Sequence, residues 1–203
     1  MLDSKKLAEA IQAGNLPDGD GLTIVPQPNL EELAKSGEAS ISLRLGRWFL
    51  VLKQSSRASF DVTAASPDTT DHASAKRYFV PFGEQFVLHP GRFTLAATLE
   101  WMRFPVSLGG YVTGKSTWAR RGLITETAAG IHPGFCGCLT LELANVGEVP
   151  IIIRPGMRIC QIFLHSVPDG KLPSQGPLSG HRRPFLGHPK HDPILEKLRK
   201  TGG

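Results

Sequence analysis

The chain has few cysteines and no long apolar run, and both features narrow the classes of protein to which it can belong. Three cysteines among 203 residues is an odd number. Two of them, Cys136 and Cys138, lie in one expected strand, so a disulfide framework is not indicated. Residues 1–14 lack the apolar core of a signal peptide, and no run approaches the ~18 apolar residues of a membrane span. We therefore expect a cytoplasmic protein that does not enter a membrane.

The charge is modest overall but unevenly distributed. The net charge is +5, and residues 179–203 carry six Lys or Arg against two acids. A basic segment of this kind can bind nucleic acid or close over a polyphosphate. Single-strand binding favours a basic stripe interleaved with aromatic residues, and the chain has none. We therefore do not expect nucleic acid as a partner.

Length and composition indicate one domain followed by a tail. Forty per cent of the residues are hydrophobic, which is enough for a sizeable core. We expect a β domain over residues 1–167. Residues 168–203 are rich in Pro and Gly, and they indicate either a disordered tail or a lid that orders over a ligand. A short helix over 194–200 is consistent with either interpretation.

Two short helices are expected near the N-terminus. Asp3 or Ser4 can cap the first, and Gly14 is a typical helix stop. The second is expected over 30–35, after Asn29, which is a good capping residue.

Most of the remaining domain has the pattern of β-structure. Residues 39–45 alternate apolar and polar side chains with the period of two of a strand. Residues 48–52, WFLVL, have the pattern of a buried strand, and the polar stretch 64–75 predicts a loop.

A Pro-Gly turn precedes three further strand patterns. Pro presets φ for the second turn position, and Gly supplies the positive φ of a type II turn. Regular turns between short strands favour an antiparallel jelly roll or β-barrel. The three turns are Pro90-Gly91, Pro133-Gly134 and Pro155-Gly156.

Residues 109–116, GGYVTGKS, match the P-loop pattern G-x-x-x-x-G-K-[ST]. A P-loop needs a strand before it and a helix after it. Here Gly122 and a β-branched stretch follow within two turns, and the regular βαβ alternation is missing. We therefore reject a P-loop. Its local chemistry remains, because a Gly-Lys-Ser-Thr turn offers N–H groups, a cation and hydroxyls to a phosphate.

One carboxylate follows this turn in a strand pattern, LTLELAN. If Leu141 and Leu143 face the core, Glu142 points to the opposite face of the strand. There it is either a solvated side chain or a rigidly held general base. Possible phosphate or catalytic partners upstream are Lys115, Ser116, Thr117 and Arg120.

Five segments, in the family's order, resemble the dCTP deaminases, which share a superfamily with the trimeric dUTPases. GKSTWARRGL resembles G-R-S-S-x-A-R-x-G-L, LTLELAN resembles the strand with the catalytic glutamate, and RPGMRICQIFLH resembles P-G-M-x-I-x-Q-x-x-F. ASISLRLG and FVLHPGRFTLAATLEW resemble the upstream segments A-S-x-D-x-R-L-G and L-x-P-G-x-F-x-L-x-x-T-x-E. The resemblance implies a mainly β fold, a distorted jelly roll or β-barrel of the dUTPase-like type with short N-terminal helices. It also implies a homotrimer with active sites between subunits.

The resemblance further implies the site residues. Ser116, Arg120 and Glu142 match the catalytic serine, arginine and glutamate. The tail RRPFLGHP resembles the family's K/R-Y-x-G-Q lid, which would make Arg183 a phosphate ligand. The expected substrate-binding residues are Lys115, Thr117, Thr127, Ala128, His132, Phe135, Gln161 and Arg183.

The chain departs from the family pattern at three positions. His132 stands where the family's I-D-P-G motif has an aspartate, which activates water in dUTPases and faces the sugar 3′-hydroxyl in dCTP deaminases. Histidine can hydrogen-bond a hydroxyl, but it is a poor substitute for an aspartate base. Ser42 replaces a strand aspartate, and Lys115 replaces an arginine that grips phosphate bidentately. These changes argue most against a dUTPase.

Zinc-dependent deamination of a nucleobase has a signature that this chain lacks. There is no H-x-E, and Cys136-Gly137-Cys138 is not P-C-x-x-C. We therefore expect no zinc, and a carboxylate acting as general base and then general acid. Mg²⁺ is expected to arrive with the triphosphate.

The leading interpretation is metal-independent deamination of dCTP to dUTP and ammonia by a homotrimer. One rival is a nucleotide diphosphatase of the dUTPase kind. The other is a trimeric nucleotide-binding sensor without turnover.

Overall fold

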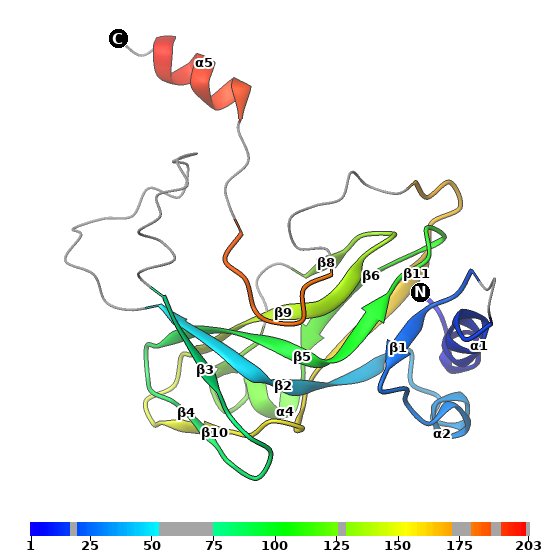
Figure 1. The fold of residues 1–203 in the computed structure, drawn as a ribbon, viewed down its shortest axis with the longest axis horizontal. Helices are drawn as coiled ribbons and strands as arrows, with labels where there is room; N and C mark the ends of the chain where they lie inside the picture. The colour runs from blue at the N-terminus through cyan, green and yellow to red at the C-terminus, as the bar shows by residue number, and fades with distance from the viewer. Residues whose placement is uncertain (17–19, 53–74, 126–128, 172–179, 188–191, 202–203) are drawn as a thin grey trace.

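The computed structural model describes residues 1–16, 20–52, 75–125, 129–171, 180–187 and 192–201 (Figure 1). No helix within these ranges is long and apolar enough to cross a membrane. The helices are α1 (Ser4–Gly14), α2 (Leu30–Lys35), α4 (Ser116–Ala119) and α5 (Pro193–Thr201). The strands are β1 (Thr23–Val25), β2 (Ile41–Leu52), β3 (Ala75–Phe79), β4 (Phe86–Leu88), β5 (Phe93–Arg103), β6 (Leu108–Gly114), β7 (Leu123–Ile124), β8 (Gly130–Ile131), β9 (Cys136–Asn145), β10 (Ile151–Ile153) and β11 (Arg158–Ser166).

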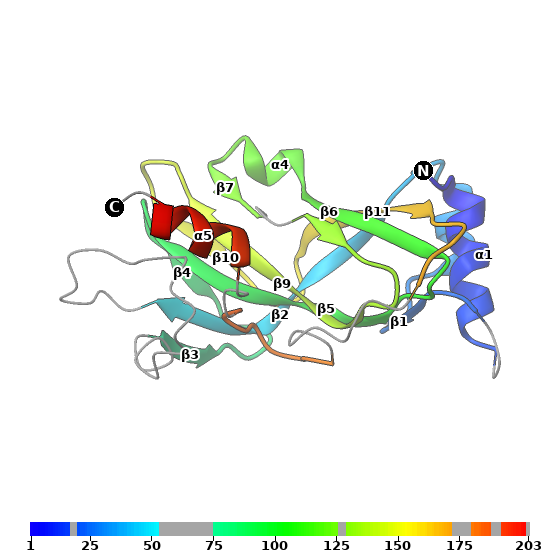
Figure 2. The same ribbon diagram turned by 90° about the horizontal axis from the view of Figure 1, so that it is seen from above.

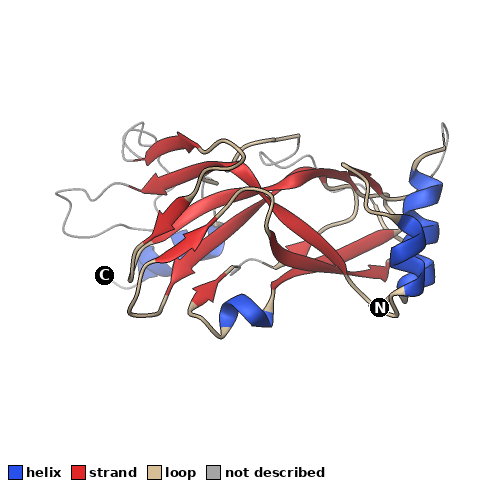
Figure 3. Cartoon of the chain, turned by 90° about the horizontal axis from the view of Figure 1, so that it is seen from below, coloured by secondary structure: helices blue, strands red, loops and turns tan. Residues whose placement is uncertain are grey.

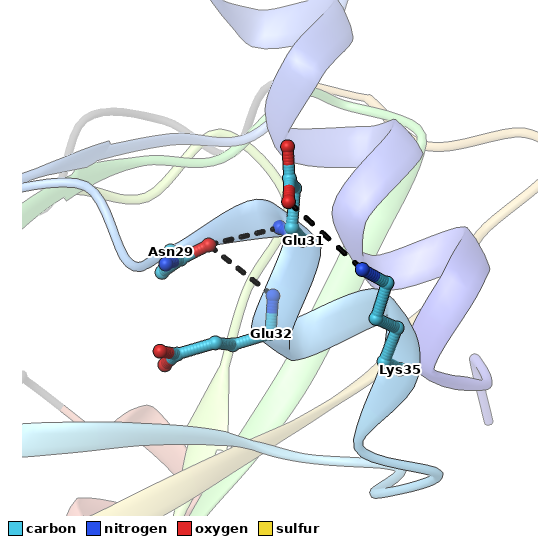
Figure 4. Close-up of polar contacts among 4 residues, drawn as sticks. All are labelled: Asn29, Glu31, Glu32 and Lys35. Atoms are coloured by element: carbon cyan, nitrogen blue, oxygen red, sulfur yellow. Dashed lines mark hydrogen bonds and ion pairs between the residues drawn. The ribbon is translucent and has the colours of Figure 1, made fainter.

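The predicted helices are confirmed, together with their caps. The Asp3 side chain accepts a hydrogen bond from the Lys6 amide at 3.0 Å and begins α1. Asn29 Oδ1 accepts from the amides of Glu31 and Glu32 at 3.1 and 3.2 Å and begins α2 (Figure 4). Helices α1 and α2 lie together at one end of the sheet (Figure 1). The short helix predicted over 194–200 is α5.

The two strands predicted over 39–45 and 48–52 form one strand, β2, which corrects the prediction. The alternation breaks at Gly46 because the strand bends there, where the pairing with β5 shifts register between Leu45 and Phe49. Gly46 allows this close approach, since a Cβ at that position would lie 2.8 Å from the Ala97 carbonyl oxygen. Of the loop predicted over 64–75, only Ala75 is described, and it begins β3.

All strand pairs are antiparallel, as the turns predicted. Within the described ranges the main sheet has the order β7-β9-β5-β2-β11-β6-β8, with β1 on β5 and β3 on β2. Strand β2 joins the two halves, because its first part pairs with β11 and its second part with β5. The sheet therefore curls around a shared core (Figure 3). Buried residues from both halves include Leu43, Phe49, Leu141, Leu143, Ile159, Ile162 and Leu164.

Each predicted Pro-Gly turn is present and leads into a strand. The φ angles of Gly91, Gly134 and Gly156 are 68°, 74° and 87°, in the region that glycine adopts without strain. The strands that follow are β5, β9 and β11. The mainly β fold predicted from these turns is confirmed.

Candidate active site

Glu142 lies on the outer face of β9, as predicted. Its neighbours Leu141 and Leu143 are 1% and 0% exposed and face the core, while Glu142 is half-buried on the opposite face. Its cross-strand partner on β5 is Leu95. A carboxylate between two buried leucines, on a strand paired with β5, has little backbone freedom. This placement suits a proton-transfer group.

The segment that matches the P-loop pattern is a strand followed by one helical turn. Residues 109–114 belong to β6 and pair with β11, so they do not form a phosphate-cradling loop, and the rejection of a P-loop is confirmed. Lys115 precedes α4, and Ser116, Thr117 and Arg120 are exposed there. The Trp118 indole N–H fixes α4 on β11 by donating to the Arg158 carbonyl at 2.7 Å.

Within one chain, helix α4 and the Glu142 side chain lie on opposite sides of the β9-β5-β2 strands. Strand β7, which follows α4, pairs with the end of β9 at Asn145, but the outer face of β9 looks away from the β6–β11 half of the sheet. Figure 2 shows α4 above the β9-β5-β2 strands and the 180–187 segment below them. The groups on α4 are therefore not placed beside Glu142 of the same chain.

Gln161 lies close to the start of the α4 segment. It is opposite Thr113 on β6 and Ser42 on β2, and its Oε1 accepts a hydrogen bond from the Ser40 hydroxyl at 3.3 Å. The next pair along β6 is Gly114 with Cys160, so Gln161 lies near Lys115. The serine that replaces the family's strand aspartate belongs to this same polar row.

His132 and Phe135 lie at the other end of β6. Ile131 pairs with Gly110, and five residues of strand at ~3.3 Å each put about 17 Å between that end and Lys115. His132 is exposed, whereas Phe135 packs edge-on against Phe104 with ring centroids 6.1 Å apart. The predicted binding residues Thr127 and Ala128 lie outside the described residues.

Arg183, predicted as a phosphate ligand, stacks on an aromatic ring of its own chain. Its guanidinium carbon lies 4.2 Å from the centroid of the Trp48 ring. Trp48 of β2 is the cross-strand partner of Phe79 of β3. It lies on the same face of the sheet as Glu142, as the register of β2 and β9 with β5 shows. The predicted site residues thus form three groups in one chain: the α4 turn with Gln161, the His132–Phe135 turn, and the Glu142 face with Arg183.

Two residues of this region were missed by sequence reasoning. Trp48 was interpreted only as part of a strand. Glu100 ends the T-x-E segment of the family resemblance, which was the signal that it matters, but no role was assigned to it. It is 6% exposed, its Oε2 accepts a hydrogen bond from the Arg44 amide at 2.9 Å, and burial raises its pKa.

The thiol of Cys138 is not activated as a nucleophile. All three are free thiols. Burial raises the pKa of Cys138, with Arg182 nearby acting in the opposite direction, so the neutral thiol is favoured. Within the described ranges no three His, Cys, Asp or Glu side chains gather as a metal site.

A hollow of about 340 Å³ adjoins α4, but its chemistry does not suit a triphosphate. Its walls are mostly aliphatic and aromatic, and two arginines also line it. The lining residues are Trp118, Arg121, Leu123, Ile151, Ile152, Ile153, Arg154 and Met157.

Comparison with known proteins agrees with the motifs. A family model described as dCTP deaminase-like matches residues 1–167. The chain belongs to the dCTP deaminase-like family. A dCTP deaminase, dUMP-forming, of Corynebacterium glutamicum is 38% identical over 165 residues, which cover 81% of this chain and 79% of that protein.

The matches to two further relatives cover a smaller share of those proteins' own length. A dCTP deaminase, dUMP-forming, of Dictyoglomus thermophilum is 41% identical over 130 residues, 64% of this chain and 65% of that protein. The crystal structure of 2′-deoxycytidine 5′-triphosphate deaminase from Agrobacterium tumefaciens matches with a TM-score of 0.56 and 22% identity, over 79% of this chain and 45% of that one. At this identity the likeness shows the fold.

Proposed function

We propose that this protein deaminates dCTP and that its final product is dUMP. The observation that carries the proposal is Glu142, held outward on β9 between two buried leucines, in a chain of the dCTP deaminase-like family. The motifs led us to expect dUTP as product. The relatives are named dUMP-forming, and this favours a second hydrolysis that releases pyrophosphate.

The chemistry requires one group to carry protons. Glu142 takes a proton from water while the oxygen adds to C4 of cytosine, and it passes the proton to N3. Glu142 then takes the proton of the new C4 hydroxyl and passes it to the C4 amino group, which leaves as ammonia as the C4 carbonyl forms. General acid–base catalysis of this kind is efficient when the carboxylate is rigidly placed. Arg120 would fix the carboxylate and Ser116 would orient the water.

Magnesium is proposed to come with the nucleotide. Residues 115–121, KSTWARR, contain no carboxylate, and Mg²⁺ favours charged oxygen ligands. The cation and hydroxyls of Lys115, Ser116 and Thr117 suit the phosphate oxygens. The ion would therefore be held by the triphosphate and neutralise its charge.

The experiment that tests the function follows ammonia and pyrophosphate separately. The protein is incubated with Mg²⁺ and a panel of deoxy- and ribonucleotides. Equal yields of ammonia and pyrophosphate from dCTP are expected, with activity lost on withdrawal of Mg²⁺ and retained with a strong zinc chelator. Ammonia alone would mean that the reaction stops at dUTP. Pyrophosphate from dUTP without ammonia from dCTP would favour the diphosphatase, and tight binding without either product would favour the sensor.

The active site is proposed to form between subunits of a homotrimer. Support comes from the separation of α4 from the Glu142 face within one chain (Figure 2). Arg120→Ala and Glu142→Gln should each be inactive alone. If neighbouring chains supply these groups, random trimers from an equal mixture regain about a quarter of wild-type activity, since both chains at a pocket must carry the intact residue. No recovery after subunit exchange confirmed by mass spectrometry would contradict the shared pocket.

His132 is proposed to contact the sugar in place of the family aspartate. His132→Asp replaces a side chain that can donate or accept a hydrogen bond with a carboxylate that only accepts, so it should change the KM for dCTP, or the deoxy-over-ribo preference, about tenfold, which corresponds to ~1.4 kcal/mol. The measurement is the KM for dCTP and CTP in both proteins. Identical constants would leave His132 as a residue that only finishes the turn before Pro133.

A further inference from the structure

The hollow beside α4 has the size and the walls of a site for a small ligand. Its volume of about 340 Å³ lies at the lower end of the ~300–1,000 Å³ of ligand pockets, which are mostly apolar with a few polar groups. Leu123 and Ile153, which line it, are buried, whereas Ile152, which also lines it, is 48% exposed. The hollow therefore reaches from the core to the surface, where a dissolved molecule can enter.

Two arginines give this apolar wall a positive charge. Arg121 Nη1 donates to the Thr117 carbonyl at 2.7 Å, and Arg154 Nη2 donates to Gln85 Oε1 at 2.8 Å. Both acceptors are neutral, and no carboxylate in the described part of the chain forms an ion pair with either guanidinium. A guanidinium has five N–H donors, so each arginine has donors left for a ligand. Two cations beside aliphatic side chains complement a molecule with an anionic group on an apolar body.

The hollow is distinct from the proposed phosphate-binding groups, although both use the α4 turn. The turn continues to Arg121, whose amide donates to the Trp118 carbonyl at 2.9 Å. Trp118 and Arg121 are three positions apart and therefore lie on one side of the turn. Ser116 and Arg120 are four positions apart and lie on another side.

Trp118 belongs both to the hollow and to the attachment of α4. Its ring lines the hollow and packs against the core, and its indole N–H donates to the Arg158 carbonyl at 2.7 Å. A ligand that contacts Trp118 and Arg121 therefore contacts the turn that carries Ser116 and Arg120.

We propose that this hollow binds a small organic anion with an apolar body, such as an aromatic carboxylate, and that the bound molecule holds α4 closed on the sheet. The carboxylate accepts charge-assisted hydrogen bonds from Arg121 and Arg154, and the apolar body packs against Trp118 and the isoleucines of β10. Opening of the α4 turn would separate Trp118 and Arg121 from the other walls and release the ligand. Occupancy therefore opposes that opening.

The site is tested with 2-naphthoate and with 2-naphthamide, a neutral probe of nearly the same shape. Calorimetry on the full chain should show that naphthoate binds about tenfold more tightly, because only the anion pairs with the arginines. Arg121→Met and Arg154→Met keep the apolar stems and should each reduce this preference. The matched control is Arg103→Met, which changes an exposed arginine outside the hollow and should leave the preference unchanged.

Three results would overturn the site. The first is equal affinity for the two probes, and the second is a wild-type preference in both Arg121→Met and Arg154→Met. The third is an absence of naphthoate binding, which is expected if a neighbouring chain covers the hollow.

The effect on α4 is tested by amide hydrogen exchange. The Ala119 and Arg120 amides donate to the Lys115 and Ser116 carbonyls, both at 3.0 Å. If opening of the turn releases the ligand, naphthoate at about ten times its Kd should slow their exchange about tenfold, by the factor 1 + [L]/Kd. The Leu33 amide of the short helix α2 is the control and should exchange at an unchanged rate.

Unchanged exchange in α4 at saturating naphthoate would overturn the effect on the turn. Neither measurement uses a nucleotide, so failure of this inference and failure of the proposed deamination are distinguishable.

Discussion

Glu142 and Glu100 lie on neighbouring strands of one sheet, yet their surroundings differ completely. Glu142 is half-buried on the outer face of β9. Glu100 is almost fully buried on β5, and its carboxylate accepts a hydrogen bond from the Arg44 amide. Burial raises the pKa of Glu100, a property often used to find catalytic acids. Here the raised pKa accompanies a hydrogen bond within the sheet, so a raised pKa alone does not identify a catalytic group.

The bend of the sheet explains why Glu100 is inside. Pairing shifts register on both sides of β5, between Leu45 and Phe49 toward β2 and between Ala97 and Trp101 toward β9. A register shift leaves backbone groups without ladder partners. Side chains replace those partners. The Glu100 carboxylate accepts a hydrogen bond from the Arg44 amide, and the Thr98 hydroxyl accepts one from the Leu139 amide at 3.0 Å. The second carboxylate therefore stabilises a bulge.

The largest difference between the two glutamates is expected in catalysis. Glu142→Gln should lower dCTP deamination by ~10²–10⁴-fold, because the amide cannot carry the proton. Thermal stability should stay near that of the wild type, since the substitution is isosteric and partly exposed. Ammonia release and a melting curve measure the two effects. Glu100→Gln is the matched control and should retain turnover. Loss of turnover in Glu100→Gln with normal turnover in Glu142→Gln would mean that Glu100, not Glu142, transfers the proton.

The straight strands and the turns were predictable from sequence because local patterns determine them. The alternation around Glu142, the three Pro-Gly turns and the caps at Asp3 and Asn29 all depend on residues within a few positions of each other. The outward direction of Glu142 followed from its two leucine neighbours alone.

The features that were missed depend on contacts distant in sequence. Glu100 meets the Arg44 amide across 56 positions, and Arg183 meets Trp48 across a still longer separation. The break at Gly46 looked like a gap between two strands because bending and ending give the same local pattern. The separation of α4 from Glu142 follows from the order of strands in the sheet, which no single segment encodes.

The second prediction removes the carboxylate of Glu100 entirely. Glu100→Ala leaves the buried Arg44 amide without an acceptor, which typically costs ~1–3 kcal/mol in the free energy of unfolding. Chemical denaturation at neutral pH measures the loss. A matched truncation, Glu142→Ala, should cost less because its site is partly solvated. Equal losses at both positions would remove the structural distinction between the two regions.

The smallest effect distinguishes the charge of Glu100 from its hydrogen bond. Glutamine keeps an oxygen acceptor for the Arg44 amide but cannot ionise. Because burial raises the pKa of Glu100 in the folded protein above its usual value of 4.5, the folded state binds the proton more tightly than the unfolded state. The contribution of this group to stability is therefore full below pH 4.5 and declines as pH rises through the folded pKa.

Glu100→Gln should lack that decline. The difference in unfolding free energy between Glu100→Gln and the wild type should be near zero below pH 4.5 and should shift in favour of the glutamine variant toward neutral pH. Parallel denaturation curves from pH 4 to 8 measure this difference, with Glu142→Gln as the reference for a partly exposed carboxylate. A difference in unfolding free energy that is constant with pH would mean that Glu100 contributes to stability through its hydrogen bond alone. The ionised carboxylate would then destabilise the folded state no more than the neutral one.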